Sequence, residues 1–199
     1  MPTSVYFDTS LFTELDIFLF KQGKHFKLYD KLGAHPQVRK GEPGVYFAVW
    51  APNAKKVSVV GDFNRWNKKS HQLGIRWDGS GIWEGFIPNM QKGDAYKFYI
   101  VSKCNNYAEY KSDPFAFSSE ISPKTASIVC STEHKWQDVS WMQNQKAKNA
   151  LDSPLSIYEL HIGSWQRNNN RFLTFREIAP KLAEHIKATG FTHVEVMPL

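Results

Sequence analysis

Residues 44–66 read GVYFAVWAPNAKKVSVVGDFNRW, and this stretch decides the fold. From residue 45 to residue 50, valine and phenylalanine alternate with tyrosine, alanine and tryptophan, a period of two that predicts a strand with two distinct faces. Residues 51–54 (APNA) break the run, because proline lacks an N–H group and asparagine favours turns. Residues 57–60 (VSVV) carry a second strand. The short spacing predicts a hairpin, the usual start of an antiparallel sheet.

Further short strands follow, separated by glycine, proline and asparagine. Residues 82–87 (IWEGFI) and 96–101 (YKFYIV) have clear strand patterns, whereas residues 107–111 and 126–130 have weaker ones. Helical periodicity is absent throughout this part of the chain. Six short strands in about 90 residues predict an all-β, immunoglobulin-like sandwich over residues 44–130.

Two kinds of segment flank the predicted sandwich. Residues 11–22 (LFTELDIFLFKQ) place apolar side chains at helical spacings before Gly23, which predicts a short amphipathic helix. Residues 24–43 mix aromatic residues with glycine and proline, so we expect an irregular connector. Residues 131–154 are polar and are interpreted as a linker.

The C-terminal segment changes character. Residues 155–162 (LSIYELHI) form a mostly apolar predicted strand; Thr174 then opens a helix as a capping box with Glu177, and Gly190 closes it. Residues 192–199 predict a second strand, so the order is that of a βαβ unit with a right-handed crossover. A parallel pair needs more strands and helices to cover it, and a (β/α)8 barrel takes about 250 residues. We therefore expect the truncated start of such a barrel.

The expected organisation has four segments. They are an N-terminal helix and connector (1–43), the all-β immunoglobulin-like sandwich (44–130), a linker (131–154) and the incomplete (β/α)8 barrel (155–199). Seven Trp, eight Tyr and fourteen Phe favour a β-rich core, flat ligand surfaces, or both.

Charge and cysteine content disfavour several classes of function. The net charge of +6 is scattered, without a basic stripe or nucleic-acid motif, so nucleic acid is not an expected partner. Cys104 and Cys130 form neither a disulfide framework nor a metal-ligand spacing, and we expect no metal or cofactor. No apolar run approaches the roughly 20 residues that span a bilayer, so no membrane partner is expected. The N-terminus lacks a signal-peptide pattern, and a cytoplasmic location is the expectation.

The loop at residues 61–66 (GDFNRW) has the chemistry of a sugar site. A sugar ring stacks its apolar face on an indole, while its hydroxyl groups need amide and charged partners. Trp66 beside Asn64 fits that description. Packing of Trp66 in the core is an equally open interpretation at this point.

Several blocks of sequence together resemble one enzyme family. FAVWAPNA (47–54) followed by SVVGDFNRW (58–66) resembles the family 48 carbohydrate-binding module, the β-sandwich that precedes the catalytic barrel in glycogen branching and debranching enzymes. SPKTASIVC (122–130) is similar to the end of that module. SIYELHIGSW (156–165) and GFTHVEVMPL (190–199) resemble the first two barrel strands of the α-amylase clan. The sequence of the first of these is most similar to that of 1,4-α-glucan branching enzymes.

The resemblance implies an activity for the parent protein. Members of that family cut an α-1,4-glucosidic bond in glycogen or starch and rejoin the cut chain through an α-1,6 bond. Their catalytic Asp and Glu residues lie at the ends of barrel strands four, five and seven, and these positions fall beyond Leu199. No catalytic residue is therefore assigned, and the chain alone is expected to be inactive.

The resemblance also implies an α-glucan as partner and names candidate binding residues. Modules of this family commonly use a Trp, here Trp66, a Lys in the later strand, here Lys97, and a second Trp in the loop beyond. The loop at residues 103–107 (KCNNY) has no Trp, and Tyr107 is the candidate substitute.

Two other interpretations stay open at this level. The chain could be a stand-alone, non-catalytic glucan-binding module, which the missing barrel would fit. It could also be a fragment of a related debranching or trehalose-releasing enzyme, since those relatives share the layout. The sequence assigns no oligomeric state.

Overall fold

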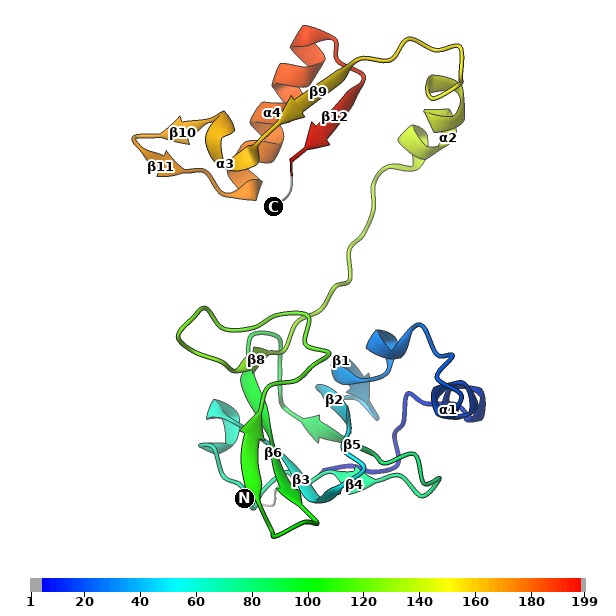
Figure 1. The fold of residues 1–199 in the computed structure, drawn as a ribbon, viewed down its shortest axis with the longest axis vertical. Coiled ribbons are helices and arrows are strands. Elements are labelled where there is room, and N and C mark those ends of the chain that lie inside the picture. Colours follow the sequence, from blue (N-terminus) through cyan, green and yellow to red (C-terminus); the bar gives the residue numbers. More distant parts are fainter. Residues whose placement is uncertain (1–4, 198–199) are drawn as a thin grey trace. The chain divides into compact units, whose positions relative to one another are not determined.

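The chain folds into two units. The computed structural model describes residues 5–197, and the units divide between His134 and Lys135. The first unit contains two four-stranded sheets, and the second contains a parallel pair of strands with helices (Figure 1). Within residues 5–197, no helix combines the length and the apolar character needed to cross a membrane.

The first unit is a sandwich of two antiparallel sheets. The first sheet contains, in spatial order, β1 (Gly33–Arg39), β2 (Glu42–Trp50), β5 (Ile82–Pro88) and β4 (Gly74–Ile75). The second contains β3 (Ala54–Gly61), β6 (Ala95–Ser102) and β7 (Ala108–Lys111), with β8 (Ser127–Ile128) also paired to β6. The strands predicted at 82–87, 96–101, 107–111 and 126–130 are thus confirmed, with small shifts at their ends.

The predicted hairpin between the first two strands is wrong. β2 pairs with β1 and β5, whereas β3 pairs with β6 in the other sheet. Both strands are strongly apolar, and the connecting residues carry the chain across the core instead of back along the same sheet. Val45 and Phe47 of β2 share one buried cluster with Val57 of β3. A period of two reveals strands but not their partners, which is why the sequence pattern misled here.

Residues 33–39 form strand β1 and not the irregular connector expected for residues 24–43. β1 pairs with β2 along its whole length, from Gly33 opposite Ala48 to Arg39 opposite Glu42. It contains Pro36, a residue that cannot donate to a ladder and is tolerated at a sheet edge. β1 is such an edge strand, which explains how a segment without a strand-like pattern joins the sheet.

The first sheet is buried on both faces. On one face, Val45, Phe47 and Val49 pack against the second sheet in the main core. On the other face, Tyr46 and Ala48 belong to a second cluster. That cluster is completed by residues from outside β2, namely Phe12, Ile17, Leu32, Ile82 and Phe86.

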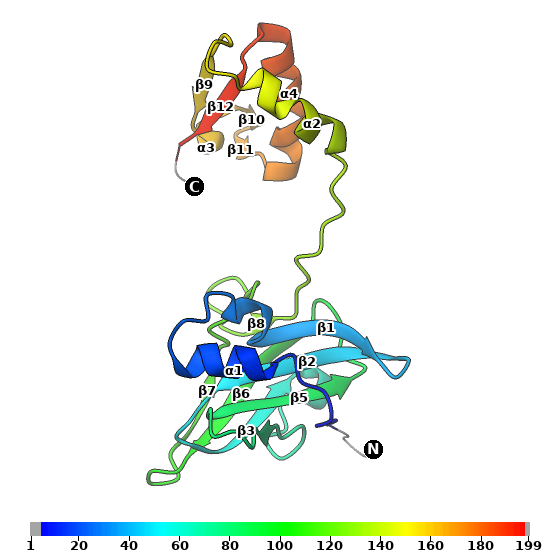
Figure 2. The same ribbon diagram turned by 90° about the vertical axis from the view of Figure 1, so that its right-hand side faces the viewer.

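Helix α1 (Glu14–Lys21) covers this second cluster and confirms the helix predicted at residues 11–22 (Figure 2). Its first turn is held by a reciprocal cap, because the Asp16 backbone N–H donates to the Thr13 hydroxyl and the Thr13 backbone N–H donates to the Asp16 carboxylate. Ile17 is the buried residue of the helix.

The second unit contains the predicted βαβ arrangement. Its elements are α2 (Val139–Lys148), β9 (Ile157–Leu160), α3 (Ile162–Trp165), β10 (Arg167–Asn168), β11 (Arg171–Phe172), α4 (Phe175–Thr189) and β12 (His193–Val196). β9 and β12 are parallel neighbours, and α4 lies between them in the chain. Thr174 caps α4 and Gly190 ends it in a left-handed conformation, as predicted.

Two details differ from the sequence-based expectation. Helix α2 lies inside the segment interpreted as a linker, residues 131–154. The strand predicted at 155–162 ends at Leu160, where the short helix α3 follows. The end of the other predicted strand, residues 198–199, lies outside the described residues.

The sparse core of the second unit makes a prediction about its stability. Among its described residues, the buried apolar side chains are those of Leu160 and Ile178. Local opening costs least where few apolar contacts are buried. We expect the backbone amides of β9 and α4 to exchange with deuterium faster than those of β2 and β5, as measured by hydrogen-exchange mass spectrometry. Exchange in β9 as slow as in β2 would contradict this.

Candidate functional site

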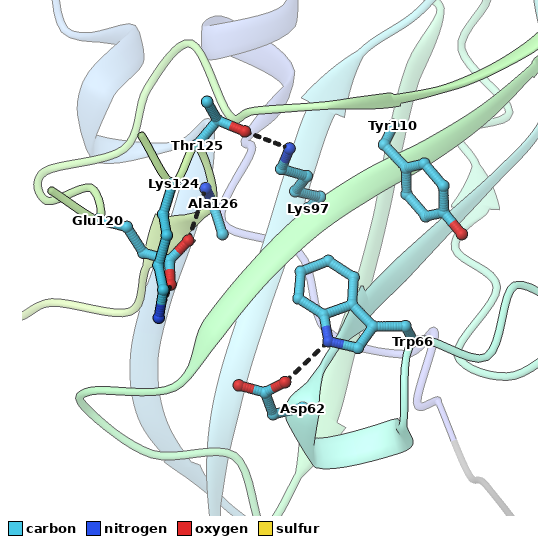
Figure 3. A pocket seen from close by; sticks show the side chains of 8 residues that line it. All are labelled: Asp62, Trp66, Lys97, Tyr110, Glu120, Lys124, Thr125 and Ala126. Carbon is cyan, nitrogen blue, oxygen red and sulfur yellow. Dashed lines mark hydrogen bonds and ion pairs between the residues drawn. The ribbon is translucent and has the colours of Figure 1, made fainter. Parts of the chain in front are cut away.

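A cleft of about 400 Å³ lies on the outer face of the second sheet (Figure 3). We call it the Trp66 cleft; it is lined by Asp62, Trp66, Lys97, Tyr110, Glu120, Lys124, Thr125 and Ala126. These residues come from the loop after β3, from β6 and β7, and from the segment before β8.

The alternation of β6 sets the floor of the cleft. Tyr96 and Phe98 point into the main core, so Lys97 between them points outward. Tyr110 of β7 lies opposite Tyr99 of β6, and directly paired residues share a face. Lys97, Tyr99 and Tyr110 therefore stand on the same exposed side of the sheet.

Trp66 reaches the cleft from an unusual loop. A 3-10 turn over Asp62–Asn64 follows β3, and both Arg65 and Trp66 adopt left-handed backbone conformations, with φ of 54° and 57°. Such conformations cost about 1–3 kcal/mol each and persist only where surrounding interactions hold the residues in place. Here the backbone N–H of Trp66 donates to the Gly61 carbonyl at 2.9 Å, which closes the loop.

The indole of Trp66 is fixed by its own polar group. Its Nε1–H donates to Asp62 Oδ1 at 2.7 Å, and its ring meets Tyr110 edge-on with centroids 6.4 Å apart. The side chain is half-buried. The hydrogen bond holds the ring in one orientation, so the apolar ring face is available to a ligand without further ordering of the side chain.

Asn64 serves the loop and does not line the cleft. Its Oδ1 accepts a hydrogen bond from the Gly61 backbone N–H at 3.1 Å, and its Nδ2 donates to the Val59 carbonyl at 3.0 Å. Gly61 itself is needed there, because a Cβ atom would collide with the carbonyl oxygen of Ala95. Asn64 therefore positions Trp66.

Tyr107 also lies outside the cleft. Its hydroxyl donates to Glu109 of β7, and its side chain is exposed. The aromatic beside Trp66 is instead Tyr110, which was not among the residues predicted from the sequence. The face on which Tyr110 lies depends on how β7 is aligned with β6. The sequence alone does not give that register, so it could not predict that Tyr110 and Lys97 share a face.

Charged and hydroxyl groups surround the two rings. Lys97 Nζ donates to Thr125 Oγ1 at 2.6 Å, and Lys124 lies 3.5 Å from Glu120 at the rim. Lys68 Nζ lies 4.8 Å from the ring centroid of Tyr99 and 5.0 Å from that of Tyr110. The Lys68 ammonium group is thus close enough to both tyrosine rings for a cation–π interaction.

The chemistry of the cleft is that of binding. It combines apolar ring faces with hydrogen-bond donors and acceptors, which include both acidic and basic side chains. This arrangement suits a neutral ligand with an apolar face and many hydroxyl groups. Within residues 5–197, no group of three or more His, Cys, Asp or Glu side chains is placed to hold a metal ion.

Residues 31–116 match the family described as carbohydrate-binding module 48 (isoamylase N-terminal domain). The match begins just before β1, in agreement with the membership of that strand in the sheet.

The chain is also similar to curated proteins along most of its length. It is 53% identical over 184 residues to the 1,4-alpha-glucan branching enzyme GlgB of Albidiferax ferrireducens, covering 92% of this chain and 29% of the relative. It is 47% identical over 197 residues to GlgB of Gloeobacter violaceus, covering 97% of this chain and 27% of the relative. The chain thus spans less than a third of the length of the curated relatives it matches.

Solved structures support the fold. The chain resembles pullulanase from Klebsiella pneumoniae complexed with maltotriose with a TM-score of 0.54 and 22% identity, covering 85% of this chain and 18% of that one. PulA from Klebsiella oxytoca gives a TM-score of 0.53 and 23% identity, covering 84% and 18%. The resemblance inferred from the sequence is therefore confirmed: residues 31–116 match a carbohydrate-binding module, and the chain is similar over more than nine-tenths of its length to the N-terminal part of 1,4-α-glucan branching enzymes.

Proposed function

We propose that the first unit binds α-1,4-linked glucan in the Trp66 cleft, and that the chain is the N-terminal glucan-binding part of a 1,4-α-glucan branching enzyme of glycogen biosynthesis. The observation that carries the proposal is the meeting of Trp66, Tyr110 and Lys97 in one cleft of a sandwich that matches a carbohydrate-binding module.

The geometry fits a glucan in a specific way. A glucose ring lies with its apolar face on the indole of Trp66, which the Asp62 hydrogen bond already orients. The ammonium group of Lys97 has three protons, of which one goes to Thr125, so the others can donate to sugar hydroxyl groups. Tyr110 offers the second aromatic surface at the side of the cleft. In this account Asn64 supports the site through the loop, and Tyr107 has no part in it.

The second unit is proposed to begin the catalytic (β/α)8 barrel. Its parallel strands leave Ile157, Val194 and Val196 between 40% and 49% exposed, an apolar surface that neighbouring barrel strands and helices would cover. The same surface argues against a stand-alone binding module, which would gain nothing from exposed parallel strands. The reaction of the whole enzyme would cut α-1,4 and form α-1,6 glucosidic bonds.

A cytoplasmic location is part of the same proposal. Cys104 and Cys130 are both unpaired thiols, which suits a reducing compartment.

The glucan site makes a direct prediction. In native gel electrophoresis with glycogen in the gel, the chain should be retarded, and Trp66→Ala should lose most of that retardation because the stacking surface is gone. We expect a fall in affinity of about tenfold, equivalent to ~1.4 kcal/mol. Unchanged mobility of both proteins in glycogen and control gels would refute a working site.

Two tyrosines on the same β6–β7 hairpin give a matched comparison for that experiment. Tyr110→Ala should weaken retardation, because Tyr110 lines the cleft, whereas Tyr107→Ala should leave it unchanged. The reverse pattern would place the glucan at the loop of residues 103–107 and overturn the assignment.

Catalysis offers a separate test. Retaining glycosidic chemistry needs two carboxyl groups about 5 Å apart flanking the bond. The resemblance implies that the family's catalytic carboxylates lie on barrel strands other than the two in this chain. The isolated chain is expected to leave the iodine-staining spectrum of amylose unchanged during incubation. A progressive loss of staining that scales with protein concentration would contradict the assignment.

A further inference from the structure

We propose that the first unit carries a second glucan-contact site, a cleft of about 360 Å³ between α1 and the turn that joins β4 to β5. We call it the Trp77 cleft. It rests on the proposed function, because the ligand class is the same. Its walls are Trp77 and Phe18, Ile17 lies at its base, and charged residues of α1 and of the turn complete its lining.

The walls are aromatic and open to solvent. The side chain of Trp77 is 89% exposed and that of Phe18 is 60% exposed, whereas Ile17 beneath them is buried. Exposed aromatic surface beside a hollow is a common mark of an interaction site. A ring face with a buried apolar floor beside it is the surface on which the apolar side of a sugar ring can rest.

The cleft is held in shape by ion pairs and a hydrogen bond. Arg76 Nε lies 2.7 Å from Asp78 Oδ2, and Arg76 Nη1 lies 2.6 Å from Glu84 Oε1 on β5. Lys21 Nζ donates to the Asp78 backbone carbonyl at 2.5 Å and so ties α1 to the turn. Because the helix and the turn are already joined, a ligand would meet a preformed cleft and lose little free energy in ordering it.

The balance of charge favours a neutral ligand. The charged residues that line the cleft are Glu14 and Asp78, which are acidic, and Lys21 and Arg76, which are basic. Arg76 and Asp78 pair with each other and are largely buried, so the exposed charges are those of Glu14 and Lys21. Two groups of each sign leave no net attraction for a phosphate, a nucleic acid or an acidic peptide. Glu14 and Lys21 do offer an acceptor and donors to hydroxyl groups, as the charged groups of the Trp66 cleft do.

The two clefts lie on opposite sides of the sandwich. Helix α1 packs on the face of the first sheet that contains Tyr46 and Phe86, whereas Trp66 stands on the outer face of the second sheet. A short oligosaccharide cannot fill both clefts at once. A branched glucan presents many chain ends, so one unit could hold two of its branches and gain affinity through avidity.

Nuclear magnetic resonance of the ¹⁵N-labelled 199-residue chain can separate the two sites. The seven tryptophan indole N–H signals are assigned by single Trp→Phe variants, and the chain is titrated with maltoheptaose. We expect the signals of both Trp66 and Trp77 to shift, and the Trp77 shift to persist in Trp66→Ala. A Trp66 signal that shifts while Trp77 stays fixed would overturn the second site alone. Two unmoved signals would overturn the proposed function as well.

Affinity for glycogen provides an independent readout. Trp77→Ala should weaken binding by about tenfold or more, since losing one of two linked contacts removes the avidity. Phe26→Ala is the matched control, because Phe26 is 88% exposed and does not line the cleft. The variant Trp77→Ala should remain folded, since its ring is almost fully in solvent. Equal glycogen affinity of Trp77→Ala and Phe26→Ala would contradict the proposal.

Discussion

Burial of the first sheet on both faces is the constraint on which the first unit depends. Alternate residues of β2 enter two different cores, with Phe47 between the sheets and Tyr46 beneath α1. Tyr46 cannot reach bulk water, and its hydroxyl donates to Glu84 Oε2 at 2.5 Å, which satisfies a polar group that would otherwise be costly to bury. Burial and the nearby carboxylate raise the pKa of Tyr46, so that it stays a neutral donor. With both faces of this sheet used for packing, the outer face of the second sheet is left for a ligand.

In the second sheet, side chains also alternate between a buried face and an exposed face. Tyr96 is buried and donates to the carboxylate of Asp113 at 2.5 Å, while Lys97, its neighbour in the chain, stands outside. The second sheet therefore has an apolar inner face and an outer face that carries polar and aromatic side chains. Hydrogen bonds of Asn64 and Gly61 fix the strained loop that carries Trp66 at the end of β3. The indole is thereby held beside Lys97 and Tyr110.

Much of this architecture follows from the sequence, and the missing parts have physical reasons. Local alternation located most strands, and the capping residues Thr174 and Gly190 located α4. Strand partners were not available from local pattern, so β2 and β3 were placed in one hairpin although they lie in different sheets. β1 was missed because Pro36 is unusual in a strand and is tolerated here by the sheet edge.

The candidate site, like the fold, could be predicted only in part from the sequence. Trp66 and Lys97 were found by residue chemistry and resemblance, and they do line one cleft. Tyr110 was missed because its face depends on the register of β7 against β6, and Asn64 does not line the cleft because its amide is hydrogen-bonded within the loop. Long-range pairing thus decides which aromatic residues meet.

The most direct test of the central claim is a crystal structure of the chain with bound maltoheptaose. The account predicts a glucose ring lying parallel to the indole of Trp66, with Lys97 within hydrogen-bonding distance of its hydroxyl groups and Tyr110 at its side. An oligosaccharide bound elsewhere, with the Trp66 cleft filled by solvent at saturating sugar, would contradict it.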